Sequence, residues 1–238
     1  MVPATQASFR MGENSMRLPS LLAAVGLATA GLVATAPAAT AAGSCSIYAP
    51  SKLAIGAPFR TITIKEGPNC TAAGVTDAAW TAVHPTKGPI DIIIYENGSR
   101  SETFDIYGED PIGKWTWRPE GAFDAIDNEV YQYTTYTDVR LASYGRVYLT
   151  RSGSKVNIKT LAGRYWQSGA KFIGWSSARG QIQYRTPGTT TWHSLKEVYS
   201  TSTGTYSYTY STTAVRDYRV VYYNVSTIWG STSPIVRK

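Results

Sequence analysis

The sequence predicts an all-β fold of two tandem β-sandwich domains, residues 43–140 and 141–238, behind an N-terminal signal peptide in residues 1–42. Three observations predict it. Runs of alternating β-forming residues, bounded by Gly, Pro, Asn or Ser, recur along the chain after residue 42. No segment there has the 3.6-residue apolar period of an amphipathic helix. The balance of charged side chains reverses near residue 140, which divides the strands into two groups.

The signal peptide is predicted from an uncharged run, Leu18 to Ala42, that directly follows Arg17 and ends in small residues suited to a signal peptidase. We expect residues 1–14 to be an upstream extension of it, and the alternative is a long n-region that carries Arg10. Its apolar core, Leu21 to Val33, is shorter than the ~20 residues that a bilayer span needs. We therefore expect no transmembrane segment after cleavage near Gly43, and a secreted, extracellular chain that associates with the cell wall.

The sequence has only two cysteines, Cys45 and Cys70, and both follow the signal peptide. In an oxidising exterior we expect them to form a disulfide bond, which stabilises the fold by about 3.5 kcal/mol in the chain-entropy model. The alternative is a lipidated Cys45. The residues before Cys45 lack the Leu-type side chain of lipoprotein signals, and lipidation would leave Cys70 unpaired.

Strands are expected wherever β-forming runs end in turn residues. In the first half, the expected strands are 59–65, 90–95, 101–107, 114–118 and 131–140. In the second half, they are 146–150, 155–160, 180–185, 192–199, 206–210, 217–223 and 233–237. Alternation predicts that the tyrosines of residues 206–210 pack in the core, and that the lysines of residues 155–159 face outward.

Charge suggests the partner. Residues 43–139 contain seven Lys and Arg against thirteen Asp and Glu, a net charge of −6, whereas residues 140–238 contain fourteen against two, a net charge of +12. The second domain is therefore expected to bind cell-wall polymers, acidic glycans or another surface protein through salt-sensitive contacts, without specific recognition of nucleic acid. The alternative is that the positive charge docks the acidic first domain. The candidate polyanion-binding residues are Lys155, Lys159, Arg164, Lys171, Arg179 and Arg185.

Acidic loops in the first domain suggest the one cofactor that the sequence offers, Ca²⁺, because carboxylate oxygens are its preferred ligands. The candidate metal ligands are Asp105, Asp110, Asp124 and Asp127. The alternative is an acidic loop that is hydrated and binds no metal ion. An acid/base pair of a two-carboxylate glycosidase, with Glu120 and Asp124 among its candidates, is a further one.

The second half resembles the Ig-like repeats of secreted and surface bacterial proteins, particularly actinobacterial ones. The residues that carry the resemblance are Val156–Lys159, Gln181–Arg185, Pro187-Gly188, Trp192 with Leu195, Gly204–Tyr210 and Asp217–Val221. Residues 90–98 and 113–117 of the first half resemble the same pattern more weakly. The resemblance implies two immunoglobulin-like sandwiches. It implies no particular function, because such repeats serve as spacers, adhesive modules and parts of enzymes.

Motifs for catalysis are weak. Gly108 to Lys114 has the glycine spacing of a phosphate-binding loop, but Trp115 replaces the hydroxyl residue, and the segment leads into an expected strand. Only two histidines, His84 and His193, are present, one in each half. We therefore expect a non-catalytic binding or adhesion protein of the cell envelope. A carbohydrate-binding protein that uses exposed aromatic side chains is the alternative.

Overall fold

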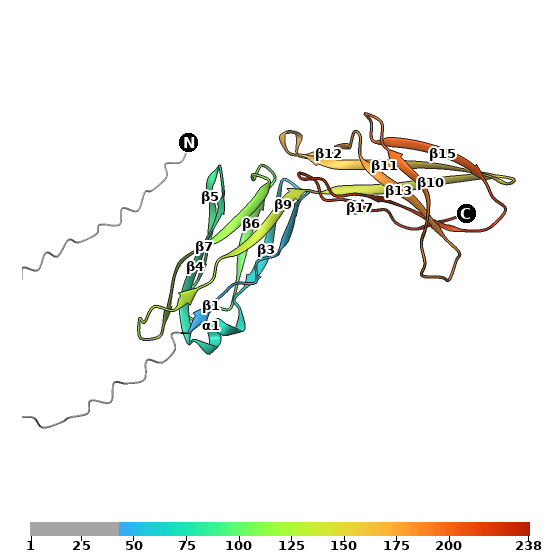
Figure 1. The fold of residues 1–238 in the computed structure, drawn as a ribbon. Coiled ribbons are helices and arrows are strands. Elements are labelled where there is room, and N and C mark those ends of the chain that lie inside the picture. The colour runs from blue at the N-terminus through green and yellow to red at the C-terminus, as the bar shows by residue number, and fades with distance from the viewer. Residues whose placement is uncertain (1–42) are drawn as a thin grey trace, which may run out of the picture. The chain divides into compact units, whose positions relative to one another are not determined.

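A computed structural model describes residues 43–238, whose regular secondary structure is almost entirely β-strand (Figure 1). The predicted signal peptide lies outside the described residues. No helix within residues 43–238 has the length and apolar character needed to cross a membrane.

The first half of the described chain forms a sandwich in which a five-stranded sheet, in the order β2-β9-β7-β4-β5, packs on the two-stranded sheet β3-β6. A short parallel pair, β1-β8, lies beside them. The elements are β1 (Ser44–Cys45), β2 (Lys52–Ile55), β3 (Phe59–Lys65), α1 (Pro68–Ala72), β4 (Val75–His84), β5 (Gly88–Tyr95), β6 (Ser101–Tyr107), β7 (Gly113–Asp124), β8 (Tyr131–Gln132) and β9 (Thr135–Leu141).

Aromatic side chains fill the space between these two sheets. Trp80 of β4 and Trp115 and Trp117 of β7 are at most 1% exposed. Phe104 of β6 meets Trp117 edge to face, with 4.9 Å between the ring centroids. Burial of side chains this large is the main favourable contribution to the stability of this half.

The second half forms another sandwich, with β10, β11, β12 and β15 in one sheet and β13, β14, β16, β17 and β18 in the other. Its elements are β10 (Ser143–Ser152), β11 (Lys155–Trp166), the 3₁₀ helix η1 (Gln167–Gly169), β12 (Lys171–Gly174), β13 (Arg179–Arg185), β14 (His193–Tyr199), β15 (Thr205–Ser211), β16 (Asp217–Tyr222), β17 (Ser231–Thr232) and β18 (Val236–Arg237). The predicted all-β sandwich fold is confirmed. Within residues 43–238, no sheet contains strands from both sides of Ala142, and the division into two independent domains stays a prediction.

Alternation along the strands is confirmed where β11 pairs with β15. Val156 lies opposite Tyr210 and Ile158 lies opposite Tyr208, all of them in or against the core. Lys155 and the other odd-numbered residues at this end of β11 are exposed.

The strand predictions need several corrections, and strands β1, β2, β4, β12 and β17 were not predicted. β4 is a central strand that was not predicted, because its three alanines are weak strand formers. The expected strand 131–140 is divided into β8 and β9. The expected strand 233–237 is reduced to β18, because the Ser233 hydroxyl accepts a hydrogen bond from the amide of Val220 and Pro234 has no N–H to donate.

Candidate functional site

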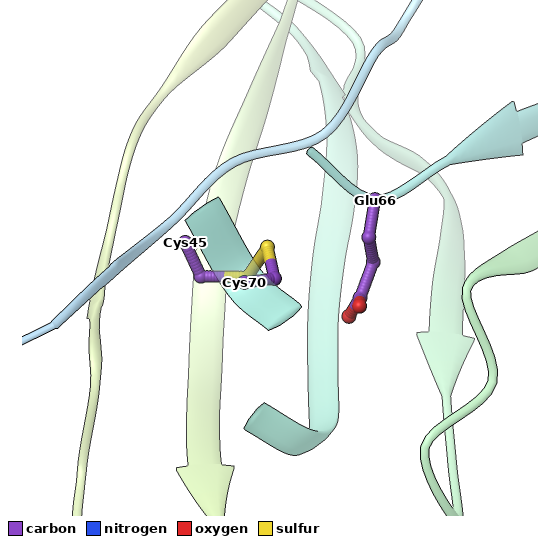
Figure 2. A group of neighbouring side chains, drawn as sticks. All are labelled: Cys45, Glu66 and Cys70. Atoms are coloured by element: carbon purple, nitrogen blue, oxygen red, sulfur yellow. A yellow bond between two sulfur atoms is a disulfide. The ribbon is translucent and has the colours of Figure 1, made fainter. Parts of the chain in front are cut away.

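The predicted disulfide bond between Cys45 and Cys70 is present, and both residues are fully buried. The Glu66 carboxylate lies beside it (Figure 2), with its oxygen and the two sulfur atoms within 4.8 Å of one another. Of the residues that the structure describes, no other set of three His, Cys, Asp or Glu side chains comes together in this way. Because the two sulfur atoms are bonded to each other, this group offers no thiolate ligands to a metal ion.

Glu66 is a buried carboxylate whose charge is balanced by one cation. Its side chain is 1% exposed, and its Oε2 accepts a hydrogen bond from Nη1 of Arg100 at 2.5 Å. Burial raises the pKa of the Glu66 carboxyl, and the hydrogen bond and charge of Arg100 oppose that rise.

Three of the four predicted calcium ligands are held by separate local contacts. Asp105 accepts a hydrogen bond from the Thr61 hydroxyl at 2.7 Å, and Asp110 accepts one from the amide of Tyr107 at 2.8 Å. Asp124 closes its own turn by accepting the amides of residues 126 and 128. In the described part of the chain these carboxylates, Asp127 included, do not meet as a group of three. Calcium binding by them stays a prediction.

Two of the carboxylates considered for glycoside cleavage have the wrong acidity for a general acid, which must hold its proton near neutral pH. Hydrogen bonds from Thr81 and Arg118 lower the pKa of Glu120. Hydrogen bonds from Asn128 and the amide of Ile126 lower the pKa of Asp124. Neither side chain is thus prepared to donate a proton.

The two histidines have separate surroundings. Nδ1 of His84 accepts the amides of Thr86 and Lys87 at 3.3 and 3.2 Å, and its Nε2 lies 3.0 Å from the carbonyl oxygen of Ile112. His193 is exposed and packs on the ring of Tyr184. The Gly108 to Lys114 segment leads into strand β7, which is the wrong element for a phosphate-binding loop.

The six predicted polyanion-binding residues lie on two different sheets. Lys155 and Lys159 project from β11, Arg164 lies near the end of the same strand, and Lys171 begins β12. Arg179 and Arg185 lie at the two ends of β13, in the other sheet. Because the two sheets of a sandwich turn their outer faces in opposite directions, these residues form two surfaces and not one.

The outer face of the sheet that contains β13 carries a group of five side chains. We call it the Arg–Trp cluster, and its members are Arg185, Trp192, Asp217, Arg219 and Arg237. The guanidinium carbons of Arg185 and Arg219 lie 4.7 and 4.1 Å from the centroid of the Trp192 ring. Asp217, 1% exposed, accepts hydrogen bonds from Arg185 at 3.2 Å and from Arg237 at 2.6 Å. Two arginines thus share the Asp217 carboxylate, and Arg219, the third arginine of the cluster, has no carboxylate partner in the described residues.

The pKa shifts within the cluster follow from its excess of arginine over aspartate. Hydrogen bonding by Arg237, with further help from Arg185, lowers the pKa of Asp217 despite its burial. Arg219 donates from Nε to Oε1 of Gln183 at 2.8 Å, which is a neutral partner. Burial and the charge of Arg185 lower the pKa of Arg219. The excess positive charge favours an anion at this face.

Sequence reasoning missed Arg219 and Arg237 as members of this surface. The signal for Arg219 was present, because it lies two residues after Asp217 in an alternating strand and so shares its face. No local pattern indicated Arg237, which reaches Asp217 because β18 pairs with β16.

Exposed aromatic side chains, on which sugar binding would depend, are mostly tyrosines. The tryptophans Trp80, Trp115, Trp117 and Trp175 are buried, whereas Trp166 is 40% exposed and lies 5.8 Å from the ammonium group of Lys171. Tyr131 and Tyr133 are exposed and meet edge to face at 5.1 Å.

No protein-family model matches the chain, and no curated protein sequence matches it. The chain is similar to the solved structure of a cytokine receptor complex at 11% identity and a TM-score of 0.38, with 75% of this chain and 90% of that chain covered. It is similar to bovine butyrophilin at 10% identity and a TM-score of 0.35, covering 82% and 98%. The D0–D1 domain of intimin matches at 12% identity and a TM-score of 0.27, covering 81% and 96%.

Identities and TM-scores this low show no family and carry no argument about function. The β-sandwich fold is established by the pairing of the strands themselves. The resemblance to Ig-like repeats is therefore supported in that coarse form, and a bacterial origin stays a prediction.

Proposed function

We propose that this chain is a secreted, non-catalytic binding or adhesion protein of the cell envelope that contacts anionic polymers through the basic surfaces of residues 141–238. The observation that supports the proposal is the number of cations in this half that lack an acidic partner.

Only two carboxylates, Glu197 and Asp217, belong to this half, and both are already paired with arginine. Within residues 43–238, ten further cations of this half have no carboxylate within 4.0 Å, and these are Arg146, Arg151, Lys155, Lys159, Arg164, Lys171, Lys196, Arg216, Arg219 and Lys238. Their charge is therefore available to an external anion.

Flexible exposed lysines and the stacked arginines of the Arg–Trp cluster suit different parts of such a contact. The lysines that project from β11 attract any polyanion at a distance, and dissolved salt weakens this attraction. Planar guanidinium groups held on an indole ring present paired N–H donors to a sulfate, phosphate or carboxylate group. A repeating anionic polymer would engage several such groups at once.

The proposed extracellular location is supported by the buried disulfide bond, since disulfides persist in oxidising compartments. Export itself rests on the predicted signal peptide. The proposed absence of catalysis is supported by the separate surroundings of the two histidines, His84 and His193.

The proposal is tested with two polymers that share a backbone, dextran sulfate and neutral dextran, together with purified wall teichoic acid. We expect the chain to bind dextran sulfate and teichoic acid, to lose about tenfold or more in affinity between 50 and 200 mM salt, and to ignore dextran. The double variant Lys155→Gln/Lys159→Gln should weaken binding, and Lys65→Gln/Lys87→Gln, in the acidic half, is the matched control. Equal binding of dextran and dextran sulfate, insensitive to salt, would instead support the carbohydrate-binding alternative.

A further inference from the structure

A groove of about 910 Å³ runs along the open side of the second sandwich, between strand β10 of one sheet and the segment that carries β17 and β18 in the other. Gly145 and Val147 of β10 form one wall, and Ser231 and Val236 form the opposite wall. The volume is in the range of sites that bind ligands.

The β10 wall is an open sheet edge. β10 pairs with β11 alone, and no other backbone hydrogen bond to residues 143–152 occurs in the described chain. The carbonyl oxygen of Ala142 accepts a hydrogen bond from the amide of Tyr165 at 2.8 Å, so the odd-numbered residues of β11 bond toward β10. The amide and carbonyl groups of Ala162, an even-numbered residue, form hydrogen bonds on the side of β11 that faces away from β10. Even-numbered residues of β10 therefore bond to β11. Gly145 and Val147 in the groove lining, and Leu149 just beyond it, direct their N–H and C=O groups to the open edge.

A side chain on the opposite wall also lacks a partner. The Ser231 hydroxyl oxygen is buried and has no hydrogen-bond partner in the described residues. A buried polar atom without a partner is costly, and a hydrogen-bonding ligand in the groove would remove that cost.

Arg146 is the only charged side chain that lines the groove, and it has no carboxylate within 4.0 Å in the described residues. It is exposed, and its guanidinium carbon lies 5.5 Å from the ring centroid of Tyr144. By strand alternation, Arg146 faces outward and Val147, 6% exposed, faces the interior of the sandwich.

We propose that this groove binds an extended acidic peptide, which adds to β10 as a further strand. Its backbone pairs with the free groups of Gly145, Val147 and Leu149, its apolar side chains alternate toward Val147 and Val236, and an acidic side chain lies beside Arg146. The groove wall of residues 143–148 is about 20 Å long, which suits a strand of typical length. This site is separate from the proposed polymer-binding function, because it recognises a peptide backbone.

The test uses the full chain and three synthetic eight-residue peptides in which valine alternates with polar residues, either threonine and glutamate, threonine and glutamine, or threonine and lysine. Amide hydrogen exchange is followed by NMR. The glutamate peptide should bind about tenfold more tightly than the lysine peptide. It should slow exchange of the Gly145, Val147 and Leu149 amides at least about tenfold, and leave the Tyr144, Arg146 and Tyr148 amides, already bonded to β11, unchanged.

Two variants locate the site. Val147→Pro removes an N–H that faces the groove and should abolish peptide binding. Arg146→Glu, on the exposed face, should reverse the preference between the glutamate and lysine peptides. Lys155→Glu is the matched control, with the same change of charge on the same sheet but outside the groove lining.

Three results would overturn the proposal. The first is that none of the peptides protects these amides at up to about 1 mM. The second is that Arg146→Glu and Lys155→Glu change peptide binding equally. The third is that protection of Gly145, Val147 and Leu149 rises with protein concentration in the absence of peptide, which would identify an interface between two copies. Dextran sulfate should leave these three amides unprotected, so a failure here is distinguishable from a failure of polymer binding.

Discussion

The hydroxyl of Tyr222 donates a hydrogen bond to the hydroxyl oxygen of Thr160 at 2.9 Å, and both residues are at most 2% exposed. Tyr222 belongs to β16 and Thr160 to β11, so the bond joins the two sheets of the second sandwich through its core. Burial raises the pKa of the Tyr222 hydroxyl, and the bond to Thr160 opposes this rise.

Removing this hydroxyl should destabilise the chain. Tyr222→Phe leaves the Thr160 hydroxyl buried without its partner, and we expect a loss of about 1–3 kcal/mol in the free energy of unfolding, measured with urea. Thr160→Val in the Tyr222→Phe background should restore part of that loss, because it removes the orphaned group. If the double variant loses as much as the sum of the two single variants, the bond is not the cause.

Asp217 should make the free energy of unfolding depend on pH in the acidic range. Because Arg237 and Arg185 lower its folded pKa below the ordinary value of 3.8, its contribution is present above that value and is lost as the pH falls through the folded pKa. Urea midpoints measured from about pH 5 down to pH 2 should fall less steeply for Asp217→Asn than for the native chain. Arg237→Gln should give an intermediate slope, and an unchanged slope in both variants would contradict the assignment.

Glu66 should have the opposite effect. Its folded pKa is raised above 4.5, so the unfolded chain ionises first, and stability falls as the pH rises from that value through the folded pKa. The stability of Glu66→Gln relative to the native chain should therefore increase over that range. Arg100→Met removes the cation that opposes the shift, and should extend the fall to higher pH. A rise in native stability over the same range, absent from Glu66→Gln, would show that Arg100 outweighs burial.

The disulfide bond should contribute through the unfolded chain. Cys45→Ala/Cys70→Ala should lower the free energy of unfolding by about 3.5 kcal/mol, because it releases a closed loop with a sequence separation of 25. A reducing agent should destabilise the native chain by a similar amount and leave the double variant unaffected. Equal stability of the native chain and the variant under oxidising conditions would contradict the expectation.

Local patterns predicted those strands whose own residues determine their structure. β3 and β6 have the bounds expected from their alternating β-formers, residues 59–65 and 101–107. β4 was missed because its strand conformation depends on neighbours. Its alanines favour other structures in isolation, and it is held by hydrogen bonds to β5 on one side and β7 on the other.

The residue types of the candidate site were predictable from the sequence, whereas their arrangement in space was not. The excess of Lys and Arg after residue 140 is visible in the sequence. The separation of Lys155 from Arg185 is not, because it depends on which sheet each strand joins. Long-range pairing also brings Arg237 to Asp217, and it leaves β10 with an open edge, neither of which alternation within one strand reveals.

A second open edge, strand β5, should control aggregation. β5 pairs only with β4, and it exposes Ile92 by 45% and Ile94 by 48%. Oδ1 of Asp91 accepts the amide of Ile92 at 2.8 Å, so this carboxylate occupies a donor that would otherwise invite another strand.

Asp91→Ala frees that amide and removes a charge from an apolar edge, and aggregation measured by light scattering should become faster. Ile92→Lys should make it slower than in the native chain, because a lysine on the edge must be desolvated before two strands can pair. Glu109→Ala, which removes the same charge from an exposed loop position of the same half, is the control. If Asp91→Ala and Glu109→Ala raise aggregation equally, net charge and not the blocked edge amide keeps the chain soluble.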